Sequence, residues 1–257
     1  VKVVYSTLCE TSTGVVNDIQ AYGKVVAKTD AILVVDTIAG LGADILKADE
    51  WNVDVVVAGS QKGLMLPPGL AFISVSEKAW KLVPTAKLPR FYFDLQYYKK
   101  SLDDDDTPFT SATTLMIGLR ESLSLMLKEG MEEVWERHRI LSVATQEAMK
   151  ALGLSLFAEH PSRALTAVRV PEGLDSGKML TILRDDLGVT LADGQAEMKG
   201  KIFRLAHLGY MNEYDLMAGI GALERTMDFL KFKVAIGAGV KAFQETFIRE
   251  NQILEFN

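Results

Sequence analysis

Two apolar runs rich in β-branched residues, at 31–36 and 53–58, constrain the fold of this chain more than any other feature. Runs of this length and composition are typical of strands that are buried on both faces of a sheet. The segments around them have helical patterns. Alternation of buried strands with helices predicts an α/β fold, in which helices cover both faces of a mostly parallel sheet.

A lysine follows the second run closely. Lys62 lies in the sequence Gly59-Ser60-Gln61-Lys62-Gly63, and a Pro-Pro-Gly turn follows at 67–69. Small residues and a tight turn hold a side chain in place, and a desolvated lysine loses its proton easily. The neutral amine is a nucleophile that forms Schiff bases with aldehydes and with pyridoxal phosphate. A solvated surface lysine gives the same local pattern, so Lys62 alone does not decide the function.

An aspartate ends the first run. Because ligands bind beyond the carboxyl ends of the strands in open α/β sheets, Asp36 and Lys62 are expected at one ligand-binding edge. A carboxylate there can pair with a protonated pyridine nitrogen, while an amine holds the aldehyde carbon. This pair of residues indicates a pyridoxal phosphate site. The alternative is that Asp36 only caps the helix that follows it.

Six short motifs occur in order along the chain. They are Glu10-Thr11-Ser12-Thr13-Gly14, Val34-Val35-Asp36-Thr37-Ile38-Ala39-Gly40-Leu41-Gly42, Gly59-Ser60-Gln61-Lys62-Gly63 with Pro67-Pro68-Gly69, Thr107-Pro108-Phe109-Thr110, Leu119-Arg120-Glu121-Ser122-Leu123 and Phe203-Arg204-Leu205-Ala206-His207-Leu208-Gly209. With these motifs, the chain resembles the class V aminotransferases of fold type I, and within them the alanine/serine–glyoxylate (serine–pyruvate) branch. The resemblance implies part of a large pyridoxal-phosphate-binding domain at 1–129, with a mostly parallel sheet, and a smaller α+β C-terminal domain at 130–257.

The resemblance also implies the roles of single residues. Lys62 matches the lysine that bonds the cofactor and moves a proton to and from the substrate. Asp36 matches the carboxylate that keeps the pyridine nitrogen protonated. Arg204 matches the arginine that binds the substrate α-carboxylate, a bidentate role that suits a guanidinium. The other cofactor-binding positions are Thr11, Ile38, Gln61 and Thr110, the last reaching the cofactor of the neighbouring subunit in a homodimer with composite sites.

Several of these residues have simpler interpretations. Thr11 could be a turn residue, Thr110 could start the next helix, and Arg204 could be a solvent-facing strand residue. His207 is expected to pack or to form a hydrogen bond, because Lys62 already supplies a base. Cys9 is expected to be a small packed residue.

The implied function is pyridoxal-phosphate-dependent transamination between a small amino acid, alanine or serine, and a small 2-oxo acid, glyoxylate or pyruvate. One alternative is another reaction of the same fold, such as 2-aminoethylphosphonate transamination or a lyase reaction. A second alternative is a catalytically incomplete subunit or interaction module. Gln61 stands where cysteine desulfurases have a histidine, which disfavours that reaction. The sequence indicates no metal site.

The match to the family has two departures. About a third of a usual family chain, from its N-terminal side, has no counterpart before Val1, and it carries the phosphate-binding turn and the ring-stacking aromatic residue. The sequence is therefore expected to be a fragment of a longer protein. Thr107 stands where some relatives have a tyrosine that reaches the phosphate of the neighbouring subunit's cofactor.

The composition fits this interpretation. The chain of 257 residues is 48% hydrophobic, and none of its apolar runs approaches the roughly 20 residues that cross a bilayer. Its formal charge of −6 argues against nucleic-acid binding. A single cysteine excludes an internal disulfide and suits a reducing cytosol. We expect a cytoplasmic protein with no membrane contact, although an N-terminal targeting segment stays open.

The pattern along the chain predicts the remaining elements and a helix break at Gly130. The turn at 66–69 is too short for a parallel crossover, so the strand after it should be antiparallel to the strand before it. Residues 94–111, with four consecutive aspartates, are expected to be a solvated loop. The predicted strands are 1–6, 31–36, 53–58, 70–75, 154–157, 165–170 and 201–205, and the predicted helices are 16–28, 42–49, a helical stretch from 112 to 152 with its break, 175–187, 213–231 and 234–251.

Overall fold

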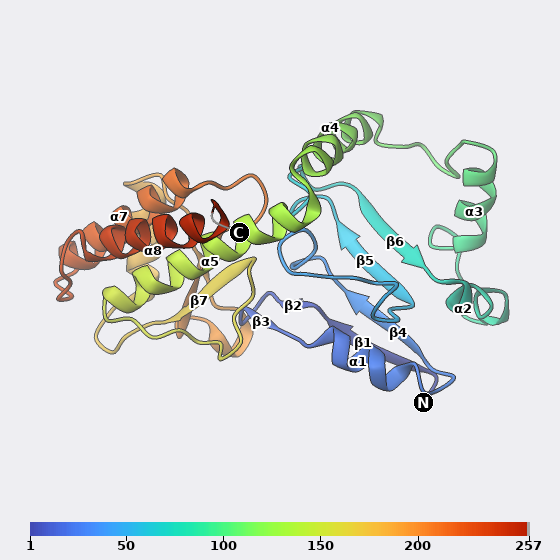
Figure 1. Cartoon of the computed structure of the whole chain (residues 1–257), viewed down its shortest axis with the longest axis horizontal. Coiled ribbons are helices and arrows are strands. Elements are labelled where there is room, and N and C mark those ends of the chain that lie inside the picture. Colours follow the sequence, from blue (N-terminus) through green and yellow to red (C-terminus); the bar gives the residue numbers. More distant parts are fainter. Residues whose placement is uncertain (256–257) are drawn as a thin grey trace.

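The computed structural model describes residues 1–255 and contains two larger sheets, one in each half of the chain (Figure 1). The first sheet has the strand order β1-β4-β5-β6. The strands β1, β4 and β5 are parallel, and β6 is antiparallel to β5, which confirms the prediction from the short turn. The bounds are β1 Val3–Thr7, β4 Ile32–Asp36, β5 Val55–Gly59 and β6 Ala71–Val75.

The register of the first sheet brings the ends of its parallel strands to one edge. Thr7 of β1 pairs with Asp36 of β4, and Asp36 pairs with Val57 of β5. Because β5 ends two residues later at Gly59, the loops after β4 and β5 leave the sheet at the same edge. This is the edge at which the sequence predicts a ligand.

Helix α1, Ile19–Val26, packs against the first sheet. Asp18 caps the helix, because its carboxylate accepts a hydrogen bond of 2.8 Å from the backbone N–H of Ala21. A Cβ at Gly23 would lie 1.7 Å from the carbonyl oxygen of Trp51, so only a glycine permits this approach. The buried cluster beneath the helix consists of Leu8, Ile19, Val26, Ala31, Leu33, Val35 and Val53.

A short hairpin connects the two halves. Its strands are β2, Cys9–Glu10, and β3, Val15–Val16, and the turn closes at Gly14, whose φ is +70°. The backbone N–H of Ser162 donates to the carbonyl of Gly14 at 2.8 Å, and Val16 donates to the carbonyl of His160 at 3.0 Å. The hairpin therefore leaves the first sheet and bonds to the chain that enters the second.

A helical segment links the sheets. Helix α4, Thr113–Glu129, and helix α5, Met131–Ala151, meet at Gly130, whose φ of +94° breaks the helix as the sequence predicts. Before them come α2, Glu77–Trp80, a 3-10 turn at Val83–Thr85 and α3, Leu95–Asp103, which project beyond β6 (Figure 1).

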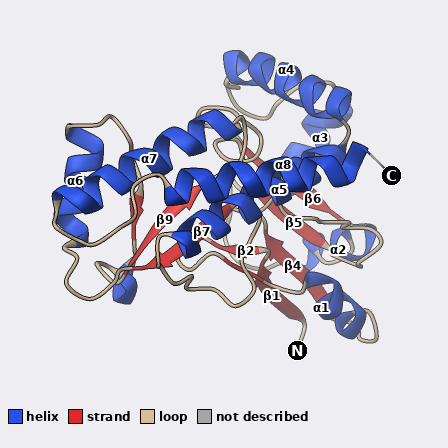
Figure 2. Ribbon diagram, turned by 60° about the vertical axis from the view of Figure 1, so that its left-hand side comes forward, coloured by secondary structure: helices blue, strands red, loops and turns tan. Residues whose placement is uncertain are grey.

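The second sheet has the order β7-β9-β8, with antiparallel pairs throughout. Helices α5, α7 and α8 lie over one face of β7 and β9 (Figure 2). Their apolar side chains form the largest buried cluster of the described chain, with Phe203 and Phe243 fully enclosed. The elements are β7 Leu165–Arg169, α6 Ser176–Asp185, β8 Ala192–Asp193, a 3-10 turn at Ala196–Met198, β9 Ile202–Ala206, α7 Glu213–Phe229 and α8 Ala238–Glu255.

Three predicted elements are wrong. Residues 42–49 form turns instead of a helix, because the Asp44 carboxylate bonds to Ser162 Oγ at 2.5 Å and to the backbone N–H of Arg163 at 2.8 Å in the other half. Residues 94–111 contain α3, whose N-cap is the Asp94 carboxylate, although the four aspartates are exposed as expected. The strand expected at 154–157 is reduced to one bridge between Leu156 and Val168.

In residues 1–255, no helix is both long and apolar enough to cross a bilayer. The α/β architecture with a mostly parallel first sheet confirms the predicted fold class. The division into domains at 129/130 stays a prediction.

Candidate active site

Lys62 lies in a tightly folded loop after β5. The buried hydroxyl of Ser60 donates to the carbonyl of Pro67 at 2.8 Å and accepts the N–H of Leu70 at 3.2 Å. The backbone N–H of Met65 donates to the Lys62 carbonyl at 2.9 Å. These bonds fold the loop back onto itself, so the half-buried lysine side chain projects from a fixed backbone.

Glycines let three segments approach the backbone of this lysine. A Cβ at Gly63 would lie 2.0 Å from the carbonyl oxygen of Leu41, in the loop after β4. Gly42, with a φ of +84°, faces Gly63 at the same contact. On another side Gly209, after β9, comes so close that an added Cβ would lie 3.1 Å from the Lys62 carbonyl. Lys62 therefore stands where both sheets meet.

The amine of Lys62 meets a hydroxyl from the hairpin. Its Nζ donates to Oγ1 of Thr11 at 3.3 Å, across a sequence separation of 51 residues. Thr11 is half-buried at the tip between β2 and β3. The structure thus brings together two of the residues that the sequence analysis selected.

Asp36 lies at the predicted edge of the first sheet, at the end of β4. The side chain is exposed, and its Oδ1 accepts the backbone N–H of Ile38 at 2.8 Å. Among residues 1–251, whose side chains the structure describes, no hydrogen bond reaches its other oxygen, Oδ2, so this oxygen can receive one from a ligand. Asp36 does cap the turn that follows, but no helix starts there. Ile38 is half-buried beside it.

Gln61 is exposed next to the lysine. Its side chain folds back over Gly59, where an added Cβ would lie 2.9 Å from the amide oxygen of Gln61. Thr110 is also exposed, in the segment between α3 and α4. In the part of the chain that the structure describes, no hydrogen bond connects Thr110 to Lys62, so the structure does not bring this residue into the group.

Arg204 enters the same region from β9. The residue is only 9% exposed, which overturns the interpretation as a solvent-facing strand residue. Its Nη1 donates to the carbonyl of Thr11 at 2.5 Å, while Nε and Nη2 donate to the carbonyl of Asp193 at 3.0 and 2.7 Å. A guanidinium has five N–H groups, so one remains on each terminal nitrogen. Two such groups are what a bidentate bond to a carboxylate requires.

Charge around this group is partly compensated by carboxylates. Hydrogen bonds from the Ser12 hydroxyl and backbone lower the pKa of Glu10, and the positive charges of Arg204 and Lys62 lower it further. Burial lowers the pKa of the Arg204 guanidinium, and the carboxylates of Asp193 and Glu10 oppose that change. Sequence reasoning missed Glu10 and Asp193 as site residues, although Glu10 begins one of the motifs.

Two histidines support the site without reaching it. The Nε2 of His138 accepts the N–H of Gly209 at 3.0 Å, and its Nδ1 donates to the Val134 carbonyl at 2.6 Å. Burial lowers the pKa of His138 to about 4, so the ring is neutral at pH 7. His207 is fully buried and bonds to Thr166 Oγ1 and the Arg163 carbonyl, which confirms the predicted packing role.

Cys9 is 3% exposed, and burial raises the pKa of its thiol to about 12. A thiol of this kind is unreactive, which confirms the prediction of a packed residue. Among the side chains that the structure describes, up to residue 251, there is no group of three or more histidine, cysteine, aspartate or glutamate residues that could hold a metal ion.

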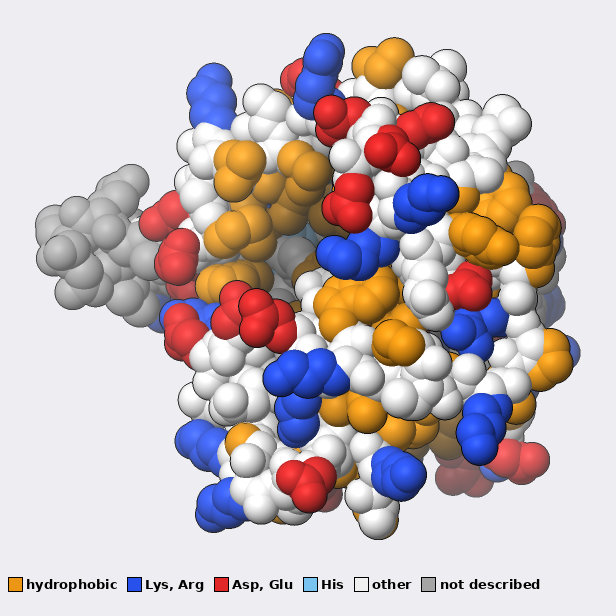
Figure 3. All heavy atoms as spheres, turned by 90° about the vertical axis from the view of Figure 1, so that its right-hand side faces the viewer, with side chains coloured by type: hydrophobic (Ala, Val, Ile, Leu, Met, Phe, Trp, Pro, Cys, Tyr) orange, Lys and Arg blue, Asp and Glu red, His pale blue; other side chains and the backbone are white. Residues whose placement is uncertain are grey.

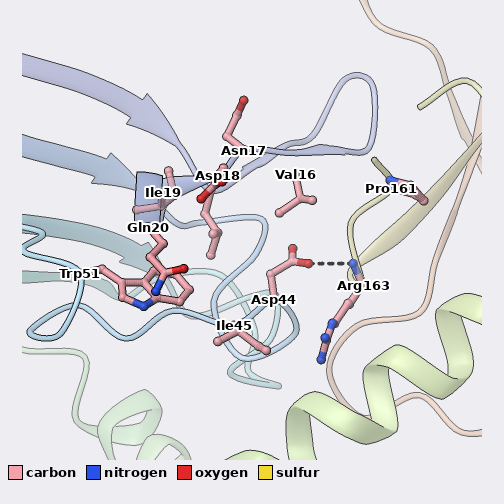
Figure 4. A pocket seen from close by; sticks show the side chains of 11 residues that line it. Val16, Asn17, Asp18, Ile19, Gln20, Asp44, Ile45, Trp51, Pro161 and Arg163 are labelled. Atoms are coloured by element: carbon pink, nitrogen blue, oxygen red, sulfur yellow. Dashed lines mark hydrogen bonds between the residues drawn. The ribbon is translucent and has the colours of Figure 1, made fainter. Parts of the chain in front are cut away.

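A separate cavity of about 250 Å³ lies between α1, the loop around Asp44 and the chain that leads into β7 (Figure 4). Asp44 lines it and accepts the backbone N–H of Arg163 there, and Trp51 forms one wall. Neither Lys62 nor Arg204 lines this cavity, so it is distinct from the candidate active site.

Comparison with known proteins identifies the family. The family model described as aminotransferase class-V matches residues 1–208. The solved structure of pyridoxamine–pyruvate aminotransferase from Mesorhizobium loti superposes with a TM-score of 0.92 at 32% identity, covering 97% of this chain and 66% of the other. The fold is that of this class of transferases, and the chain belongs to the class-V aminotransferase family.

Curated relatives carry different names. A protein named "Soluble hydrogenase, small subunit" from Synechococcus is 44% identical over 245 residues, which are 94% of this chain and 64% of the relative. Serine–glyoxylate aminotransferase from Methylorubrum extorquens is 38% identical over 263 residues, covering 98% and 65%. The chain thus spans just under two thirds of the length of these relatives.

Membership of this family implies pyridoxal phosphate as the cofactor. The residues of this chain fit such a group. Lys62 offers an amine on a fixed loop, Asp36 offers a carboxylate at the same sheet edge, and Thr11 offers a hydroxyl beside the amine. Backbone packing at Gly63 keeps these loops in place.

Proposed function

We propose that the protein catalyses pyridoxal-phosphate-dependent transamination between a small amino acid, alanine or serine, and a small 2-oxo acid, glyoxylate or pyruvate. The observation that carries the proposal is the meeting of Lys62 and Arg204 at one residue, Thr11. An amine and a guanidinium at one turn can receive the reacting carbon and the carboxylate of one small substrate. Serine–glyoxylate aminotransferases among the relatives favour the same substrate class.

In this proposal the chain's own residues divide the work. When bound, pyridoxal phosphate supplies an electron-withdrawing ring that stabilises negative charge at the substrate α-carbon. Asp36 would hold the protonated ring nitrogen with its carboxylate. Lys62 would hold the cofactor through Nζ and would move the proton to and from the substrate α-carbon. Thr11 orients that amine through Oγ1.

Arg204 binds the substrate by its α-carboxylate, with the N–H groups left on its two terminal nitrogens. Because amino acid and 2-oxo acid share this carboxylate, one arginine serves both half-reactions. Ile38 and Gln61 lie on the loops after β4 and β5. We assign them to cofactor contact.

We further propose a homodimer in which Thr110 contacts the cofactor of the neighbouring subunit. Thr110 is exposed in the segment between α3 and α4, which leaves it available to a partner. Hydrophobic side chains also gather on the face that carries α2 and α3 (Figure 3). Exposed apolar residues there include Leu88, Phe91, Tyr92, Phe93, Tyr97 and Leu102, a patch typical of an interface. The single, buried Cys9 favours a reducing compartment such as the cytosol.

The proposal is tested on the full-length protein, purified with pyridoxal phosphate. Alanine, serine, aspartate and 2-aminoethylphosphonate are supplied as donors with glyoxylate or pyruvate as acceptors, and both products are measured. The expected result is transfer from alanine or serine to glyoxylate or pyruvate. Preferred transfer from 2-aminoethylphosphonate, release of ammonia without an acceptor, or no reaction with any donor would each contradict it.

A further inference from the structure

Arg204 is buried and bonds to backbone carbonyls. Among residues 1–251, whose side chains the structure describes, it forms no ion pair, and its three hydrogen bonds go to the carbonyls of Thr11 and Asp193. A buried guanidinium is costly unless its charge is compensated. The carbonyls that bond to the guanidinium must therefore be well oriented.

The first carbonyl is aimed by Glu10. The carbonyl of Thr11 and the N–H of Ser12 belong to one planar peptide and point in opposite directions. The N–H donates to Oε1 of Glu10 at 2.9 Å, and the carbonyl accepts from Nη1 of Arg204 at 2.5 Å. The Ser12 hydroxyl adds a second bond of 2.7 Å to the same carboxylate oxygen. Glu10 thus fixes the plane that faces Arg204.

The second carbonyl is aimed in the same way. The peptide between Asp193 and Gly194 directs its carbonyl to Arg204 and its N–H to Oδ1 of Asp193 itself, at 2.7 Å. The N–H also faces the carbonyl of Ile202 at 3.0 Å. A Cβ at position 194 would lie 1.9 Å from the Met198 carbonyl, so the backbone can take this course only at a glycine.

We propose that Glu10 and Asp193 are positioning residues for Arg204, each acting through one peptide, and that together they set the affinity for substrate carboxylates. A direct Arg–carboxylate pair is commonly bidentate and would occupy the N–H groups that the substrate needs. Hydrogen bonds to two backbone carbonyls, each oriented by a carboxylate on the other side of its peptide, leave one N–H of each terminal nitrogen of Arg204 for the substrate. The inference rests on the proposed role of Arg204 in binding the α-carboxylate.

The test compares Glu10→Ala with Glu10→Gln in the full-length holoenzyme. The alanine variant frees the Thr11–Ser12 peptide, so KM should rise about tenfold for the amino acid and the 2-oxo acid alike, while kcat changes less than threefold. The inhibition constant of propionate, which has a carboxylate and no amine, should rise by the same factor. The glutamine variant keeps a side-chain oxygen that can accept the hydrogen bonds from Ser12, so its KM should stay within threefold of the wild-type value. Glu147→Ala, at an exposed pair with Lys150, is the control.

A double variant separates positioning from general damage. If Glu10 acts through Arg204, Glu10→Ala should raise KM no further in an Arg204→Lys background. Additive effects, a loss confined to kcat, or a glutamine variant as poor as the alanine variant would overturn the inference. If Glu10→Ala does not fold, Glu10→Asp withdraws the carboxylate by one methylene and should give the same common rise in KM. An unchanged KM would then overturn the inference.

Asp193→Ala should raise KM by a smaller factor than Glu10→Ala. The Gly194 N–H keeps its hydrogen bond to the carbonyl of Ile202, which still orients the peptide. An unchanged KM in this variant would remove Asp193 from the assignment. Failure of the proposed carboxylate-binding role of Arg204 can be distinguished from failure of the positioning role of Glu10. In the first case Arg204→Lys itself would leave KM unchanged. A raised KM in Arg204→Lys with no effect of Glu10→Ala would refute only the positioning role.

Discussion

Oγ1 of Thr11 accepts a hydrogen bond from Nζ of Lys62 at 3.3 Å, and the carbonyl of the same threonine accepts one from Arg204. The lysine follows a strand of the first sheet, and the arginine lies on the central strand of the second. One hairpin residue therefore fixes the positions of the Lys62 amine and the Arg204 guanidinium relative to each other.

Lys62→Ala should abolish transamination, because an alanine has no amine to hold the cofactor or to move the α-proton. Borohydride reduction of the wild-type holoenzyme, followed by peptide mapping, should label a single peptide at Lys62. The exposed Lys87→Ala should keep full activity and the same label. A label on another lysine would refute the assignment.

Asp36→Asn should fold normally but lose most activity. The amide oxygen can still accept the Ile38 N–H, which preserves the turn. A neutral amide holds a protonated ring nitrogen poorly, and losing a charged hydrogen bond costs about 1.5–3 kcal/mol, more where charge develops in the transition state. Turnover is compared with Asp104→Asn in the exposed acidic run. Near-normal kcat would show that Asp36 is only a cap.

Arg204→Lys should weaken amino acids and 2-oxo acids together, since both present the same carboxylate and an ammonium cannot bind it as a planar fork. Cofactor absorbance should be retained. Steady-state kinetics with several donors measures the effect, with Arg184→Lys at an exposed pair as the control. A defect limited to one donor would point to the substrate side chain instead.

Gly63→Ala should destabilise the fold by about 1–3 kcal/mol or more, because its Cβ would lie 2.0 Å from the Leu41 carbonyl. Gly219, inside α7, has no atom within 4 Å of a built Cβ. Gly219→Ala should instead be neutral or stabilising by up to about 1 kcal/mol, because alanine is the better helix former. Urea unfolding of both variants measures the difference, and equal effects would contradict the close contact.

The free energy of unfolding should decrease as the pH is lowered from about 6.5 to about 4. Burial lowers the pKa of His138 to about 4, so in this range the unfolded chain binds a proton that the folded chain does not. Each such histidine contributes up to about 1.4 kcal/mol per pH unit. His138→Gln should flatten the dependence in urea unfolding at pH 7, 6 and 5. The exposed His160→Gln should keep the wild-type slope, and an unchanged slope in His138→Gln would oppose this assignment.

Local sequence patterns predict the first sheet well. The strands at 31–36 and 53–58 are continuous β-branched runs, and the Pro-Pro-Gly turn determines the antiparallel direction of β6. The helix expected at 42–49 fails because Asp44 bonds to residues about 118 positions away. The missed β8 has two residues, too few for a periodic pattern.

The candidate site is predictable to the extent that it follows from strand ends. Asp36 and Lys62 could be placed at one edge because parallel strands end together. The orientation of a peptide plane has no such signature, so the carboxylates of Glu10 and Asp193 emerge only from the folded backbone. The role of Thr110 at a neighbouring subunit's cofactor stays a prediction.

The turn from Glu10 to Gly14 is closed by backbone bonds from Thr13 and Gly14 to the Glu10 carbonyl, at 3.2 and 2.8 Å. Its tip contacts Lys62 through a side chain and Arg204 through the main chain. The length of this turn therefore sets the distance between the Lys62 amine and the Arg204 guanidinium. An inserted residue in this turn would change the size of molecule that can span the two groups.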